Sequence, residues 1–277
     1  MKIGISTFVT DEGIAPADLG AALEERGFES LFVAEHTHIP VDRQSPYPAG
    51  GELPGIYYRT LDPFVVLTAA AVPTTRLRLG TGIALLVERD PIVTAKEVAS
   101  LDLVSDGRVI FGVGAGWNRE EMRNHGTDPR IRGALLDERV RAMRALWTEE
   151  RAEYHGQYVD FDPVYCWPKP VQRPYPPIYV GGASEATAAR VREYGDSWMP
   201  TGVPDAASLA PLWQRMRAGA GKDVPVTIYA GSKQLDRLDG FAELGVERVL
   251  VYLPTRPRDE TLTYLDDLAS LVERFAL

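Results

Sequence analysis

The chain has 277 residues, of which 45% are hydrophobic and 25% are charged, as in ordinary folded domains. Its formal net charge is -9 at pH 7, and its isoelectric point is about 5.1. This balance argues against a nucleic-acid partner, which favours a basic face, and against an anionic membrane surface. The length suits one large α/β barrel or two small domains.

The number of cysteines and the first residues of the sequence indicate the cell compartment in which the protein is expected. Cys166 is the only cysteine, so no disulfide forms within the chain and a reducing compartment is expected. Residues 1–5 enter an apolar strand pattern with no charged-then-apolar leader, and no apolar run reaches the length of a membrane span. We therefore expect a cytoplasmic protein.

Strand and helix patterns alternate along the chain. Eight apolar runs predict strands, in chain order Lys2–Thr7, Ser30–Glu35, Leu77–Gly82, Val109–Val113, Pro177–Val180, Ser197–Met199, Val226–Ala230 and Arg248–Tyr252. The helical segments between and after them are Pro16–Arg26, Pro63–Val72, Ile92–Val104, Leu135–Thr148, Glu185–Tyr194, Ala206–Ala218, Lys233–Leu244 and Asp259–Phe275. Eight strand-helix units predict an α/β fold, a single (β/α)8 TIM barrel forming one domain over residues 1–277.

Two long connections interrupt this rhythm. Thr37–Asp62, after the second strand, is rich in Pro, Gly and Tyr, and Ala152–Pro176, before the fifth strand, is rich in aromatic residues and Pro. Long connections without regular structure are usually functional or disordered. Loops that follow barrel strands lie over the active-site face, so we expect Thr37–Asp62 to line a pocket.

Polar residues end the second predicted strand. In an extended chain His36 and His38 point to one side, and Glu35 and Thr37 to the other. A His-x-His pair on a barrel strand can bind zinc, but the chain has only four histidines and no other strand end clearly supplies ligands. We therefore favour His36 as a hydrogen-bond donor or acid–base group beside a cofactor ring.

Glycines end three other strands. Gly80-Thr81-Gly82-Ile83 resembles a bulge whose backbone approaches a planar ring. The run from Gly112 to Asn118 lacks the G-x-G-x-x-G spacing of a dinucleotide site, and leaves a glycine-lined pocket beside Trp117. Gly181-Gly182-Ala183-Ser184 opens a helix, where free N–H groups favour a phosphate.

Residues for covalent catalysis are missing from the sequence. Cys166 has no histidine pattern near it, and the chain has neither a Gly-x-Ser-x-Gly elbow nor a phosphate loop ending in Gly-Lys-Ser/Thr. The sequence is thus typical of an enzyme whose cofactor performs the difficult step.

Taken together, these motifs resemble the luciferase-like monooxygenase superfamily, and within it the oxidoreductases that use the deazaflavin coenzyme F420. The similarity covers most of residues 1–200. Its motifs are Glu35–Pro40, Arg76–Gly82, Glu97-x-x-x-Leu101-Asp102-x-x-Ser105-x-Gly107-Arg108, Gly112–Asn118 and Lys169–Gly182.

The resemblance implies a TIM barrel with a flavin-like ring at the carboxyl ends of its strands. It implies that the ring lies against Gly82–Ile83, joined by a cis peptide bond, and near Gly114 and Ala115. It places the phosphate at Gly181, Gly182, Ala183 and Ser184. His36 corresponds to a catalytic or cofactor-contacting histidine of the sugar-phosphate dehydrogenases in the family. A homodimer is also expected from the resemblance.

Two departures from those dehydrogenases change the expected chemistry. Trp117 stands where they carry an acid, and Pro40 where they carry a tryptophan, so their proton-transfer scheme does not carry over whole. We predict hydride transfer between F420 and a small organic substrate, with His36 and Glu35 as catalytic residues. The alternatives are an FMN-dependent monooxygenase supplied by a separate reductase, and a non-catalytic flavin-binding protein. The predicted substrate walls are Trp117, Tyr57, Trp198 and His38, and no metal is expected.

Overall fold

The computed structural model of the protein describes residues 1–275. Eight parallel strands form the barrel, in the spatial order β10-β11-β1-β2-β3-β5-β8-β9. Their bounds are β1 Lys2–Thr7, β2 Ser30–Val33, β3 Arg78–Thr81, β5 Val109–Gly114, β8 Ile178–Gly181, β9 Ser197–Met199, β10 Thr227–Gly231 and β11 Arg248–Tyr252. A single parallel bridge between Trp198 and Val226 joins the two ends of this row, so the barrel is nearly closed.

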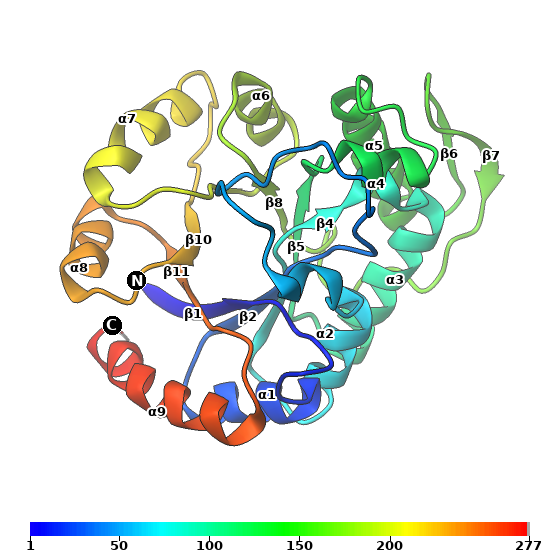
Figure 1. The fold of residues 1–277 in the computed structure, drawn as a ribbon. Coiled ribbons are helices and arrows are strands. Elements are labelled where there is room, and N and C mark those ends of the chain that lie inside the picture. Colours follow the sequence, from blue (N-terminus) through cyan, green and yellow to red (C-terminus); the bar gives the residue numbers. More distant parts are fainter. Residues whose placement is uncertain (276–277) are drawn as a thin grey trace.

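Helices surround the strands (Figure 1). They are α1 Pro16–Glu25, α2 Pro63–Ala71, α3 Pro91–Val104, α4 Arg119–Asn124, α5 Arg132–Thr148, α6 Glu185–Glu193, α7 Ala206–Arg217, α8 Leu235–Leu244 and α9 Arg258–Phe275. Every predicted strand and helix is present, so the predicted (β/α)8 barrel is confirmed. The second strand ends at Val33, two residues earlier than predicted, and Glu35 and His36 therefore lie just beyond it.

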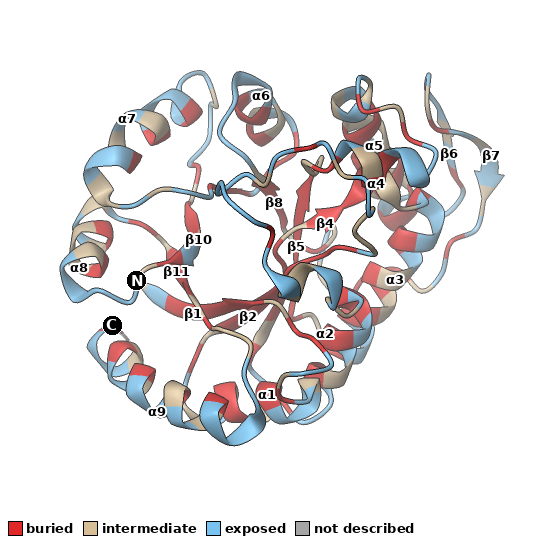
Figure 2. Ribbon diagram, in the orientation of Figure 1, coloured by how far each residue is buried: buried red, intermediate tan, exposed pale blue. Residues whose placement is uncertain are grey.

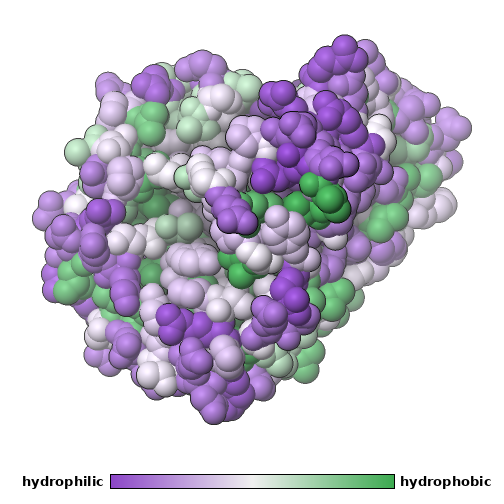
Figure 3. Space-filling view, viewed as in Figure 1, coloured by the Kyte–Doolittle hydropathy of each residue, from purple (hydrophilic) through white to green (hydrophobic). Residues whose placement is uncertain are grey.

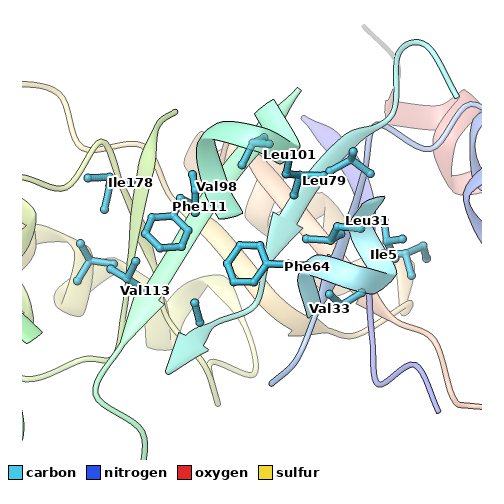
Figure 4. Packing of buried hydrophobic residues seen from close by; sticks show 14 of the residues in the cluster. Ile5, Leu31, Val33, Phe64, Leu79, Val98, Leu101, Phe111, Val113 and Ile178 are labelled. Carbon is cyan, nitrogen blue, oxygen red and sulfur yellow. The ribbon is translucent and has the colours of Figure 1, made fainter. Parts of the chain in front are cut away.

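The main hydrophobic core lies between the strands and the helices. In Figure 4, side chains from the strands, such as Ile5, Leu31 and Phe111, face Phe64 of α2 and Val98 of α3. Fully burying one such side chain stabilises the fold by roughly 1.5–3 kcal/mol. The helices show buried residues on the side facing the strands and exposed residues outside (Figure 2).

A smaller cluster fills the inside of the barrel. Phe32, Ile110, Tyr179, Met199 and Leu250 are buried there. A Cβ atom at residue 80 would lie only 2.4 Å from the Phe32 ring, so Gly80 makes room for that ring. This glycine therefore has a packing role inside the barrel.

A buried arginine pairs with a partly exposed glutamate at the opposite end of the barrel from the carboxyl ends of the strands. The Arg248 guanidinium donates to both carboxylate oxygens of Glu29 at 2.7 Å, and to Tyr179 and Thr227. Its side chain is only 2% exposed. A buried cation of this kind is stable only while its partners remain in place.

Several short elements were not predicted. The segment before β8 contains an antiparallel hairpin, β6 Ala152–His155 and β7 Asp160–Val164, so Ala152–Pro176 is not wholly irregular. Strand β4, Ala84–Leu85, and the 3-10 turns η1, Gly55–Tyr58, and η2, Leu86–Glu88, were also missed. None of the helices within residues 1–275 combines the length and the apolar character needed to cross a bilayer.

Candidate functional site

The predicted site residues converge because their strands are neighbours. Strands β2, β3, β5 and β8 lie side by side and run parallel, so their carboxyl ends meet at one edge of the barrel. His36 follows β2, Ile83 follows β3, Ala115 follows β5 and Gly182 follows β8. The segment after β2, residues 37–62, crosses in front of the strands (Figure 1).

Glycines at two strand ends leave space for one side chain. A Cβ at Gly114 would lie 1.9 Å from Ile83 Cδ1, and a Cβ at Gly181 would lie 3.2 Å from Ile83 Cγ2. The half-buried Ile83 thus rests on both glycines, and the Gly82–Ile83 peptide bond is cis, as the resemblance implied. On its other side, Gly82 makes room for the Tyr229 ring. The result is an apolar floor with little side-chain bulk.

The start of helix α6 is exposed and partly free of hydrogen bonds. Ser184 and Thr187 form a capping box, in which the Ser184 hydroxyl accepts from the Thr187 N–H at 3.2 Å. The Ser184 side chain therefore serves the helix. The other N–H groups of the first turn have no partner inside the helix. Together with Gly182 and Ala183, which are exposed, they remain able to bind an anion.

His36 is buried and oriented by a carboxylate. Its Nδ1 lies 2.7 Å from Glu121 Oε2, and the other Glu121 oxygen accepts from the Thr37 N–H at 3.1 Å. A carboxylate accepts hydrogen bonds, so Nδ1 carries the proton and Nε2 is left to exchange one. The Glu121 side chain is fully buried, so His36 is held in one orientation.

Aromatic side chains surround His36. The Tyr57 and Trp117 rings lie 5.1 and 5.8 Å from the His36 ring, and Tyr47 lies 5.4 Å from Tyr57. Burial raises the pKa of the Tyr57 hydroxyl, with Tyr47 adding to the effect. The segment 37–62 therefore walls the site, as predicted, and Figure 3 shows a hollow in the molecule beside it.

Two predicted residues, Glu35 and Trp198, lie in other surroundings. The Glu35 carboxylate accepts from the Leu85 N–H at 2.6 Å and from Arg89, so it anchors the segment after β3. Trp198 is fully buried in the main core and donates to the Gly182 carbonyl at 2.6 Å, which supports the α6 loop from behind. Neither side chain contacts His36, and we assign both structural roles.

His38 lies apart from His36, beside α4. Its Nε2 is 2.9 Å from the Asn124 amide, and its ring centre is 5.3 Å from that of His125. Within residues 1–275, no group of three or more His, Cys, Asp or Glu side chains is placed to hold a metal ion. The two histidines of the His-x-His pair therefore have separate partners.

Glu121 was not recognised from the sequence. It comes three residues after Asn118, which caps α4 by accepting from the Glu121 N–H. The Asn-x-x-Glu spacing is that of a capping box, in which the glutamate would fold back onto its own helix. Here the carboxylate reaches across to His36 instead. The spacing indicates the helix start, but only the tertiary structure reveals the partner.

A second glutamate was also missed. Both carboxylate oxygens of Glu88 are buried and have no hydrogen-bond partner within residues 1–275. Burial, with Glu121 and Glu35 nearby, raises the Glu88 pKa to about 9. The Glu88 carboxyl group is therefore neutral at pH 7, where an exposed glutamate would be charged.

We expect Glu88→Gln to stabilise the fold in a pH-dependent way. Between its ordinary pKa of 4.5 and about 9, the folded protein binds a proton that the unfolded chain releases, so stability falls as pH rises. Glutamine does not ionise, so the variant does not lose stability in this way as pH rises. Its free energy of unfolding should exceed the parent value by on the order of 2 kcal/mol at pH 7. Urea denaturation across this pH range measures the difference. A difference that does not grow with pH would contradict the assignment.

Comparison with known proteins places the chain in a family. Residues 15–232 match the luciferase-like monooxygenase family. The chain is 44% identical to the uncharacterised protein Rv0953c of Mycobacterium tuberculosis over 98% of both chains. It is 29% identical to the F420-dependent glucose-6-phosphate dehydrogenase of Nakamurella multipartita, over 83% of this chain and 62% of that enzyme. A 112-residue stretch, 38% of this chain and 30% of the relative, is 35% identical to the FMNH2-dependent dimethylsulfone monooxygenase of Pseudomonas putida.

Solved structures share the fold. The monooxygenase RslO1 from Streptomyces bottropensis superposes with a TM-score of 0.79 at 22% identity, covering 100% of both chains. An F420-dependent secondary alcohol dehydrogenase gives a TM-score of 0.73 at 20% identity, covering 98% of this chain and 99% of that one. Members of this family are oxidoreductases or monooxygenases, and relatives of this chain use either F420 or FMN. The barrel, its sequence motifs and these matches agree, and the chain belongs to the luciferase-like monooxygenase family.

Proposed function

We propose that the protein transfers a hydride between coenzyme F420 and a small organic substrate. The observation that carries the proposal is the His36–Glu121 pair, buried at the carboxyl edge of the barrel near an apolar glycine-backed floor. An oriented histidine beside such a floor can exchange a proton where a ring-shaped cofactor exchanges a hydride. The F420-dependent relatives in the family support this choice.

The residues present fit a flat cofactor with a phosphate. Gly82, Ile83, Gly114 and Ala115 would hold the ring. Because Gly114 and Gly181 have no side chain, Ile83 can pack down onto them and would support one face of the ring. Gly182, Ala183 and the first turn of α6 would hold the phosphate through N–H groups. The Glu185 side chain carries a negative charge at that turn and does not attract a phosphate. Backbone N–H groups must therefore supply the phosphate binding.

The side chains around the floor have separate tasks. When bound, reduced deazaflavin supplies the hydride, because a carbon replaces the flavin N5 and makes it a two-electron carrier. His36 holds or delivers a proton at Nε2, and Glu121 fixes its ring orientation. Tyr57 and Trp117 would bound the substrate and limit the access of water.

A second candidate is an FMN-dependent monooxygenase. It is favoured by the similarity to the dimethylsulfone monooxygenase over 112 residues, and it would require oxygen and a reductase that supplies reduced FMN. A non-catalytic flavin-binding protein is a third possibility that binds the ring without turnover. The organisation of the whole chain as one domain, and its pairing as a homodimer, remain predictions.

A fluorescence titration of the purified protein with oxidised F420 and, in parallel, with FMN tests the proposal. We expect F420 to bind with a dissociation constant of about 1 μM or lower, and FMN to bind at least about tenfold more weakly. Gly114→Val serves as a matched variant, because its side chain would displace Ile83 from the floor. It should weaken binding while circular dichroism remains that of the parent.

Each outcome separates the candidates. Tight binding of FMN alone would favour the oxygenase. Binding of neither cofactor by well-folded protein would overturn the assignment of a flavin or deazaflavin site. Equal binding by the Gly114→Val variant would place the ring elsewhere on the molecule.

A further inference from the structure

Two adjoining hollows lie on the surface beside helix α4. They have volumes of about 640 and 620 Å³. Both are lined by Arg119, Arg123 and Arg132, and the first is also lined by Arg130. Strongly hydrophilic side chains gather in the region of α4 and α5 in Figure 3. We call these two hollows together the arginine hollow.

The charge of the arginine hollow is opposite to that of the whole chain. The protein carries a formal net charge of -9, yet four arginines line this surface against two carboxylates, Asp128 and Glu120. Such a concentration of guanidinium groups repels itself unless anions neutralise it.

The two carboxylates neutralise only half of the arginines. Arg130 pairs with Asp128 at 2.6 Å, and Arg123 pairs with Glu120 at 3.1 Å. Arg119 and Arg132 have no carboxylate within 4 Å among residues 1–275, and both are exposed. Guanidinium groups are suited to paired hydrogen bonds with carboxylate or phosphate.

The arginine hollow is continuous with the wall of the candidate site. Trp117 and Gly116 line the second hollow, and Trp117 also packs against the His36 ring. The Arg43 guanidinium lies over the Trp117 ring at 5.4 Å. A molecule that reaches past Trp117 would therefore place one end near His36 and the other at the arginines.

We propose that the arginine hollow binds the carboxylate or phosphate groups of a small anionic molecule, with Arg119 and Arg132 as its main contacts. The anion has two possible sources, an acidic substrate or the acidic side chain of the deazaflavin cofactor. Binding of anions at the arginine hollow does not depend on the proposed function. The identification of the anion as part of substrate or cofactor does rest on it.

The test uses citrate as the probe, titrated calorimetrically into the full chain at low salt. We compare the parent with Arg119→Gln/Arg132→Gln and with Arg76→Gln/Arg151→Gln. The second pair removes the same charge from two exposed arginines outside the hollow. We expect the first pair to weaken citrate binding at least about tenfold, and the matched pair to leave it unchanged. Added salt should weaken binding by the parent.

The citrate titration tests whether the arginine hollow binds anions, and a second titration then identifies the source of the anion. Absence of citrate binding to the parent, or equal weakening by both pairs, would overturn the arginine hollow as an anion site. If the site holds, an F420 titration of the same variants follows. Weaker F420 binding by Arg119→Gln/Arg132→Gln alone assigns the hollow to the cofactor, and unchanged F420 binding assigns it to the substrate. Failure of F420 to bind the parent would count against the proposed function and leave the citrate result standing.

Discussion

Replacing His36 by Gln is expected to lower turnover by roughly 10²–10⁴-fold while cofactor affinity stays that of the parent. Glutamine retains a polar group but does not exchange a proton at neutral pH, so only the proton-transfer task is lost. The measurement is the oxidation of reduced F420 with a substrate found by screening small carbonyl compounds, together with a fluorescence titration of F420. His155→Gln, in the exposed hairpin, is the matched control.

A positioning variant sharpens this prediction. Glu121→Gln keeps the size of the side chain but removes the carboxylate that holds His36 Nδ1 at 2.7 Å. We expect a smaller loss of turnover than for His36→Gln, because the imidazole remains but loses the carboxylate that fixes its orientation. If His36→Gln leaves every reaction untouched while the cofactor still binds, the protein is a carrier and not an enzyme.

Replacing Arg248 by Met is expected to lower the free energy of unfolding by about 3–5 kcal/mol. The substitution leaves the Glu29 carboxylate, whose side chain is 26% exposed, without the bidentate partner that it has at 2.7 Å. It also removes hydrogen bonds to Tyr179 and Thr227. Urea denaturation measures the loss, with the transition midpoint and slope compared to those of the parent.

Two further variants show whether burial is the cause. Arg141→Met breaks an exposed bidentate pair with Glu193 and should cost no more than about 1 kcal/mol. Adding Glu29→Gln to Arg248→Met removes the unpaired carboxylate and should recover part of the loss. A cost for Arg248→Met as small as that of Arg141→Met would show that the pairing of the buried Arg248 adds little to stability.

The barrel was predictable because its signals are local. Strands β1 and β11 were predicted with their observed bounds, Lys2–Thr7 and Arg248–Tyr252, since each is a short apolar run that ends at a change of pattern. The hairpin of β6 and β7 was missed because most of its residues are at least partly exposed, so it produces no apolar run. A strand can be predicted from the sequence mainly when its residues are buried, because buried residues produce an apolar run whereas strand propensity alone does not.

The site was only partly predictable for a different reason. His36 was predicted as a site residue because it directly follows a barrel strand, and this placement can be read from the sequence alone. Glu121 lies 85 residues further on, and its contact with His36 depends on how α4 packs. Trp198 is the middle residue of a strand of three residues, which is too short for alternation to show which side the tryptophan faces. The hydrogen-bond partner of a side chain and the direction in which it points depend on the tertiary structure, so a single sequence does not predict them.

The position of β1 has a consequence for the order in which the protein is made and folded. This first strand lies between β2 and β11, with Lys2 opposite Arg248 and Ile5 opposite both Leu31 and Val251. On the ribosome, β1 emerges long before its neighbour β11, because the other barrel strands lie between them in the sequence. One edge of β1 therefore stays unpaired until β11 has been made, and is exposed to pairing with other chains. The barrel therefore cannot be completed before β11 has emerged, and a chain that stops before Arg248 leaves open edges on both β1 and β10.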